Sequence, residues 1–110
     1  MKLPIIVRKI SGHSMMPVLP PGTYIWGAKY FRNLHAGDTV IFVHENREKV
    51  KRIHDIKGKE IYVLGDHPEA SKDSRHFGWL PISSVLAKVI WPHAPHSRAE
   101  NVGADSLNES

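Results

Sequence analysis

The sequence predicts a mainly β domain of short strands with one or two helical turns. Its β-rich runs are short, turn-forming residues separate them, and no stretch keeps the 3.6-residue period of a long helix. A chain of 110 residues has room for a single domain with a modest core. The hydrophobic share of 41% and the charged share of 24% are typical of soluble globular domains.

Each predicted strand is a run rich in β-branched or aromatic residues that ends at turn formers. The predicted strands are Ile5–Ile10, Thr23–Ala28, Thr39–His44, Lys49–Ile56, Glu60–Leu64 and Val85–Ile90. The turns between them are Pro20–Gly22, Ala36–Asp38, Lys57–Lys59 and Gly65–Pro68. Glycine permits positive φ there, and proline fixes φ and lacks a backbone donor. Single helical turns are predicted at Ser14–Pro17 and at Ile82–Val85, where Pro81 can start the turn.

The composition changes near the C-terminal end. From Ala94 onward the residues are mostly small or polar, with almost no large apolar side chains. Such a segment cannot bury enough surface to offset its ordering entropy. We therefore predict a folded domain over residues 1–93 and a disordered tail over residues 94–110.

Composition excludes several classes of function. The chain has no cysteine, so disulfides and thiolate chemistry are excluded, and the reducing cytoplasm is the expected location. The net charge of +4 comes from scattered basic residues, which argues against a nucleic-acid partner. The apolar run Leu3–Val7 is far shorter than the ~20 residues of a membrane-spanning helix. We expect neither an intrinsic membrane span nor an export signal.

The first segment with chemical potential surrounds Ser14. This serine follows the flexible Gly12 and precedes Met15 and Met16. A strand that gives way to a turn here would place a hydroxyl at the edge of an apolar groove, with free backbone N–H groups near it. An ordinary loop serine fits the same pattern, and this segment alone favours that interpretation.

The second segment contains Lys51, which shares one face of a predicted strand with Ile53, whereas Arg52 points to the other face. A lysine on an apolar face usually extends its ammonium group to water. If the amine is buried instead, desolvation lowers its pKa, and a neutral amine can take a proton from a serine hydroxyl.

The third segment is the polar stretch Gly65–Gly78. Ser71 could orient the Lys51 amine, and Asp73 with Arg75 could form a charge-assisted pair that fixes the loop. A solvated, charged turn explains the same composition equally well when the segment is taken alone.

Together these segments resemble the signal peptidase I superfamily of Ser–Lys peptidases. Gly12–Pro17 matches the Gly-x-Ser-Met-x-Pro box, and Gly37–Phe42 is similar to the Gly-Asp-x-Val-x-Phe box. Lys51–Ile53 is similar to the Lys-Arg-x-Ile box with one residue fewer, and Ser71–Gly78 meets the Ser-x-Asp-Ser-Arg-x-x-Gly box in full. Four boxes in register are far more specific than one short motif. The resemblance implies a small signal-peptidase/LexA-like, β-barrel-like domain of coiled antiparallel sheets.

The resemblance also implies roles for individual residues. Ser14 would be the nucleophile and Lys51 its general base, Ser71 would orient the lysine, and Asp73 with Arg75 would hold the loop. The Ser14 backbone N–H would serve as the oxyanion donor, because Gly12 stands where some relatives supply a second donor hydroxyl. An extended substrate would pair with a strand edge near Ser11–Ser14. The expected substrate-binding residues are Ser11, Gly12, Met15, Leu19 and Val50.

The stretch Leu64–Gly78 looks most like the corresponding stretch of nickel-type superoxide dismutase maturation peptidases, except that His67 replaces an asparagine. This likeness implies a protein substrate, a dismutase precursor, that loses an N-terminal propeptide. Any nickel would belong to that substrate, so we expect no metal or cofactor in this chain. The alternatives are a leader peptidase that acts at a membrane and a non-catalytic peptide-binding β-module.

The eight histidines raise two other hypotheses. His13 could be the base of a Ser–His enzyme, but adjacent strand-like residues point to opposite faces, so it is poorly placed to reach Ser14. A metal site could use Asp66, His67, Asp73 and His76, although their spacing matches no familiar ligand pattern.

Overall fold

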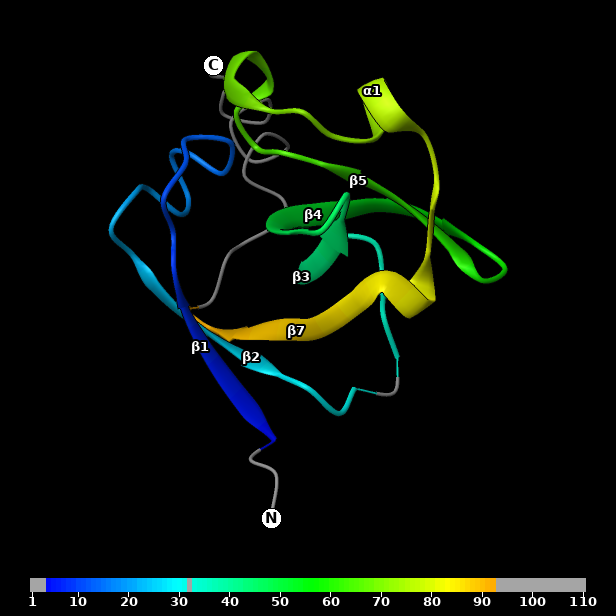
Figure 1. Ribbon diagram of the computed structural model, residues 1–110, viewed down its shortest axis with the longest axis horizontal. Helices are drawn as coiled ribbons and strands as arrows, with labels where there is room; N and C mark the ends of the chain where they lie inside the picture. Colours follow the sequence, from blue (N-terminus) through cyan, green and yellow to red (C-terminus); the bar gives the residue numbers. More distant parts are fainter. Residues whose placement is uncertain (1–3, 32, 93–110) are drawn as a thin grey trace, which may run out of the picture.

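The computed structural model describes residues 4–31 and 33–92, so the predicted tail, residues 94–110, lies outside the described residues. The described part is mainly β, as predicted, and its strands form one antiparallel sheet of order β1-β2-β7-β3-β4-β5-β6 (Figure 1). The strands are β1 (Ile5–Lys9), β2 (Tyr24–Ala28), β3 (Thr39–His44), β4 (Arg47–Lys57), β5 (Glu60–Leu64), β6 (Leu80–Pro81) and β7 (Val85–Trp91).

The predicted strands correspond closely to those observed. The bounds of β3 and β5 are as predicted, and β4 begins two residues earlier than expected, at Arg47. The sequence did not indicate the short strand β6 or the one-turn helix α1 (Ser74–Phe77). The predicted turn at Ser14–Pro17 is a hydrogen-bonded turn, and short 3₁₀ segments occupy Pro68–Ala70 (η1) and Ile82–Ser84 (η2).

A tight hairpin joins β3 to β4 and extends β4 beyond the predicted start. Glu45 and Asn46 form its two-residue loop, with φ values of 54° and 63°. Both central residues of a type I′ turn need positive φ, and this turn matches the twist of the flanking strands. The hairpin therefore sets the register that places Lys51 opposite Val40.

Two apolar clusters pack on the sheet. One includes Phe42, Val40 and Ile53, and the other includes Ile41, Met15 and Leu19. Because successive residues of a strand face opposite sides, the fully buried run of β3 contributes to both clusters. The second cluster supports the loop that carries Ser14.

The sheet is strongly coiled. β2, β7 and β3 lie between β1 and β4 in the strand order, yet Arg8 Nε on β1 lies 2.7 Å from Glu48 Oε1 on β4. Figure 1 shows β7 passing between the β1–β2 pair and β3. Register shifts in the β2–β7 and β3–β7 pairs locally increase twist and bending. The coiling brings β1 and β4 together around a cavity.

Candidate active site

A cavity of about 240 Å³ lies between β1, the loop that follows it, and β4. Its wall includes both Ser14 and Lys51, which are far apart in the sequence. The lining residues are Arg8, Lys9, Ile10, Ser11, Gly12, Ser14, Met15, Glu48, Lys49, Val50 and Lys51. The fold thus brings the predicted nucleophile and the predicted base to one cavity.

Ser14 lies half-buried in the loop after β1. Hydrogen bonds from Met16 N to His13 O (3.1 Å) and from Leu19 N to Met15 O (2.8 Å) shape this loop. The Ser14 carbonyl accepts a 2.7 Å hydrogen bond from His67 N, which joins the loop to the segment after β5. Within the described residues the Ser14 N–H donates no hydrogen bond, so it is available to a ligand.

The predicted substrate-binding residues occupy different places. Ser11, Gly12, Met15 and Val50 line the cavity. Leu19 does not line it: the side chain is 1% exposed and packs in the second core cluster with Met15. Leu19 therefore supports the cavity wall from within the core.

Lys51 projects from β4 and is only 6% exposed. Burial lowers the pKa of its amine, because desolvation disfavours the ammonium form. Asp73 opposes this shift, and the nearby charges of Lys49 and Arg75 add to it. Within residues 4–31 and 33–92, no hydrogen bond or ion pair reaches the Lys51 ammonium, so none joins it to Ser14. The sequence indicated this face of β4 but not the burial of the lysine.

Asp73 is fully buried and organises the loop between η1 and α1. Its carboxylate accepts hydrogen bonds from Arg75 Nε (2.9 Å), Ser71 Oγ (2.6 Å) and Gly65 N (2.8 Å), and it caps α1 through Arg75 N (3.1 Å). Burial raises the pKa of Asp73, but these hydrogen bonds outweigh burial and hold the pKa well below its usual range. Ser74 Oγ accepts a 2.8 Å hydrogen bond from Val63 N, which docks the loop on β5.

Gly65 joins this loop to the nucleophile loop. A Cβ atom at this position would lie 2.7 Å from the Ser14 carbonyl oxygen and would overlap the side chain of Ser71. Only glycine allows the two loops to approach so closely. Figure 1 shows the blue loop after β1 beside the yellow-green segment after β5, in agreement with the hydrogen bond from His67 to Ser14. The sequence had marked Gly65 only as a turn former.

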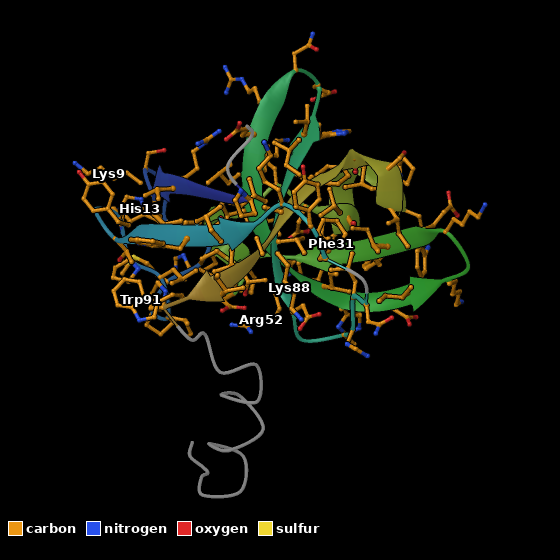
Figure 2. The ribbon with its side chains drawn as sticks, turned by 90° about the horizontal axis from the view of Figure 1, so that it is seen from below. Lys9, His13, Phe31, Arg52, Lys88 and Trp91 are labelled. Carbon is orange, nitrogen blue, oxygen red and sulfur yellow. The ribbon has the colours of Figure 1, made fainter. Side chains whose placement is uncertain are left out.

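Arg52 connects β4 with the turn at Gly37 and with the segment that follows β5. Its guanidinium donates to both carboxylate oxygens of Asp66, at 2.9 and 2.6 Å, and to the Gly37 carbonyl at 3.0 Å. Figure 2 shows Arg52 and Lys88 near each other, and Lys88 Nζ lies 3.6 Å from Asp38 Oδ2 in the same turn. This network fixes the strand that carries Lys51. The adjacent Lys-Arg pair and the Gly-Asp pairs were visible in the sequence, but their contact was not.

The alternative histidine sites can now be located. His13 is exposed and lies near Lys9 in the view of Figure 2. Asp66 and Asp73 are engaged by Arg52 and Arg75, respectively. In the described part of the chain, no group of three or more histidine, aspartate or glutamate side chains is placed to hold a metal ion. The same residues include no helix long and apolar enough to cross a bilayer.

Comparisons with known proteins agree on one family. The model of the family described as "Signal peptidase, peptidase S26" matches residues 45–94, which include Lys51 and Ser71–Arg75. The chain is 32% identical over 119 residues to the mitochondrial inner membrane protease subunit 1 of Schizosaccharomyces pombe. That alignment covers 82% of this chain and 75% of the relative, so it extends over most of both proteins. The chain belongs to the signal peptidase family, peptidase S26.

Proposed function

We propose that this protein is a serine endopeptidase in which Ser14 is the nucleophile and Lys51 is the general base. The observation that carries the proposal is that both side chains line one cavity, where burial lowers the pKa of the lysine. A neutral amine can accept the hydroxyl proton of serine, which an ammonium group cannot do.

The proposed reaction has two halves. Ser14 Oγ transfers its proton to neutral Lys51 Nζ and attacks the scissile carbonyl, and the Ser14 N–H donates to the developing oxyanion. The Lys51 ammonium then returns the proton to the leaving amine as the C–N bond breaks, which leaves an acyl-enzyme on Ser14. In the second half Lys51 takes a proton from water, whose oxygen attacks the ester, and the proton finally returns to Ser14.

Ser71 is proposed to orient the lysine. Because the Ser71 hydroxyl proton is donated to Asp73, only the lone pairs of Ser71 Oγ remain for a further partner. Ser71 would then accept a hydrogen bond from a Lys51 N–H and direct the amine lone pair toward Ser14. Asp73 and Arg75 would keep Ser71 in place.

The proposed substrate is a protein whose N-terminal propeptide is removed, and the finer proposal is a nickel-type superoxide dismutase precursor in the cytoplasm. Its support is the similarity of Leu64–Gly78 to the corresponding stretch of dismutase maturation peptidases. An extended substrate would lie along β1, because in the described sheet β1 pairs only with β2 and leaves its other edge free for strand addition.

A second candidate function is leader removal at a membrane. Val7, Trp26 and Trp91 are paired across β1, β2 and β7, and their side chains are 44%, 46% and 59% exposed. Figure 2 shows Trp91 at the margin of the molecule. Tryptophan is enriched at bilayer interfaces, so this row favours contact with a membrane surface. Sedimentation with anionic lipid vesicles, compared between the wild type and Trp26→Ser/Trp91→Ser, separates this candidate from the cytoplasmic one.

The main experiment incubates the protein with a nickel-type dismutase precursor and determines new N-termini by mass spectrometry. The wild type should release one propeptide, and Ser14→Ala and Lys51→Met should each lower kcat by about 10³-fold or more. His13→Ala should retain activity because His13 has no proposed part in the proton transfers. Activity that persists in Ser14→Ala would refute the dyad. Peptide binding without turnover by the wild type would favour the non-catalytic module.

A further inference from the structure

A second cavity adjoins the first and is lined mainly by basic residues. Its volume is about 480 Å³, and it lies between the β3–β4 hairpin and the segment that follows η1. The lining residues are Glu45, Arg47, Lys49, Lys51, Ala70 and Lys72. Lys49 and Lys51 line both cavities, whereas Ser14 lines only the first.

The strand itself produces this concentration of charge. Arg47, Lys49 and Lys51 alternate along β4, so all three side chains point to one face. They run from exposed Arg47 through half-buried Lys49 to buried Lys51. Lys72 adds a fourth basic side chain from the loop that precedes Asp73.

Within the described part of the chain the basic side chains of this cavity form no ion pairs, although the charge of Asp73 acts on Lys51. Other cations are paired, such as Arg8 with Glu48, Arg52 with Asp66, and Arg75 with Asp73. Arg47, Lys49, Lys51 and Lys72 form no ion pair within residues 4–31 and 33–92. The Lys49 ammonium instead lies 5.1 Å from the centre of the Phe77 ring. Oε1 of Glu45, the acidic residue of the lining, lies 3.8 Å from His44 Nε2.

Like charges on one strand face repel one another, and an anion held among them would relieve that repulsion. We infer that this second cavity selects substrates that carry an aspartate or glutamate shortly after the scissile bond, with Arg47, Lys49 and Lys72 as the specificity-determining residues. This inference rests on the proposed function and deepens it.

The position of the acidic substrate residue, after the scissile bond, follows from the residues that line the two cavities. In the proposed reaction Lys51 returns a proton to the leaving amine, so the leaving segment passes close to Lys51. Ser14 and its N–H hold the acyl side in the first cavity. A cavity that contains Lys51 but not Ser14 therefore lies on the path of the leaving segment.

The test uses a library of random twelve-residue peptides, with cut positions determined by mass spectrometry. For the wild type we expect aspartate and glutamate to be enriched about threefold to tenfold in the first three positions after the cut, as for a few partly exposed ion pairs. Lys72→Glu and Arg47→Glu should each reduce or reverse this enrichment. Lys59→Glu is the matched control, because Lys59 is exposed in the β4–β5 turn and lines neither cavity.

A binding arm separates failure of this inference from failure of the proposed function. The same library is captured on immobilised Ser14→Ala, with and without Lys72→Glu, at low and high salt. Acidic peptides should be enriched, and both high salt and Lys72→Glu should weaken the enrichment. Cleavage without acidic preference overturns the inference and leaves the proposed function standing. If Ser14→Ala captures acidic peptides but the wild type cleaves no peptide, the proposed function is refuted and the acidic preference of the second cavity stands. Acidic enrichment before the cut, or enrichment that Arg47→Glu and Lys72→Glu leave unchanged, also overturns the inference.

Discussion

Ser71 Oγ donates a 2.6 Å hydrogen bond to Asp73 Oδ2, and both side chains are buried. The same carboxylate receives Arg75 and the Gly65 N–H, so one aspartate fixes the loop that faces Lys51. Since a carboxylate only accepts hydrogen bonds, Asp73 must be ionised to hold all of these donors at once.

Asp73→Asn should therefore destabilise the fold. We expect the free energy of unfolding at pH 7 to fall by about 2 kcal/mol, less than for a fully buried ion pair, because the Arg75 side chain is 38% exposed. The pKa of Asp73 is lower in the folded state, so its stabilisation is complete above about pH 4 and is lost as the pH falls further. Urea denaturation of both proteins at pH 7, 5 and 3 measures the difference.

The exposed Glu69 supplies the control, since Glu69→Gln removes a carboxylate that makes no ion pair in the described residues. The free energy of unfolding of Glu69→Gln should stay within about 0.5 kcal/mol of the wild-type value. A gap between Asp73→Asn and the wild type that is as large at pH 3 as at pH 7 would contradict the ionised carboxylate.

Gly65→Ala should disturb the site through steric overlap. The new methyl group would meet both the Ser14 carbonyl and the Ser71 side chain, so the two loops must separate. We expect a loss of about 1–3 kcal/mol in the free energy of unfolding, measured by denaturation, and a larger relative loss of kcat. Gly12→Ala is the control for stability, because a Cβ atom there meets no atom within 4 Å. Equal stability of the two variants would contradict the close approach at Gly65.

The strands were predictable because their signals are local. The run Thr39–His44 is rich in β-branched and aromatic residues and is bounded by turn residues, and β3 has those bounds. The hairpin loop at Glu45 was not predictable, because glutamate is not a usual residue for positive φ. Helix α1 spans only four residues, which is too short to show a helical period in the sequence, and it depends on a cap from Asp73.

The sequence predicted candidate site residues, but it did not predict the contacts that the structure gives them. Four boxes in register indicated Ser14, Lys51 and Ser71, yet no spacing rule predicts that Ser14 and Lys51 line one cavity. The pairing of Arg52 with Asp66 depends on the β4–β5 register, which shifts between Ile53 and Asp55, and sequence periodicity does not reveal such a shift. Contacts of this kind come from tertiary packing.

The Arg52–Asp66 pair, which joins β4 to the segment after β5, should contribute more to stability than the Arg8–Glu48 pair, which joins β1 to β4. The side chains of Arg52 and Asp66 are 11% and 17% exposed and form two hydrogen bonds, whereas those of Arg8 and Glu48 are 43% and 40% exposed. Double-mutant cycles with methionine for arginine, asparagine for Asp66 and glutamine for Glu48 measure both couplings. We expect about 1–3 kcal/mol for the first pair and less than 1 kcal/mol for the second. The reverse order would contradict this ranking.

The pH dependence of activity should follow the ionisation of Lys51. Because burial lowers the pKa of the amine, kcat/KM should rise with pH and then reach a plateau. The midpoint of the rise should lie below the ordinary lysine pKa of 10.5. Lys49→Met removes a neighbouring positive charge that lowers this pKa, so the midpoint should move to higher pH. Lys59→Met, at an exposed position in the β4–β5 turn, should leave the profile unchanged. A profile that does not respond to Lys49→Met would argue against Lys51 as the titrating base.

Lys51→Met should abolish cleavage and yet stabilise the fold at neutral pH. The lowered pKa means that the unfolded chain binds the Lys51 proton more strongly than the folded protein does. The stability of the wild type therefore rises with pH between the folded and the unfolded pKa of Lys51. Methionine fills similar space without a charge, and we expect a gain of about 1 kcal/mol at pH 7. Above the unfolded pKa the lysine is neutral in both states, so the gain should shrink as the pH approaches and passes 10.5. Urea denaturation across this range, with Lys59→Met as the exposed control, measures the trend. A variant less stable than the wild type at pH 7, or a gain that grows toward alkaline pH, would show that the folded protein favours the ammonium form and that Lys51 is not poised to act as a base.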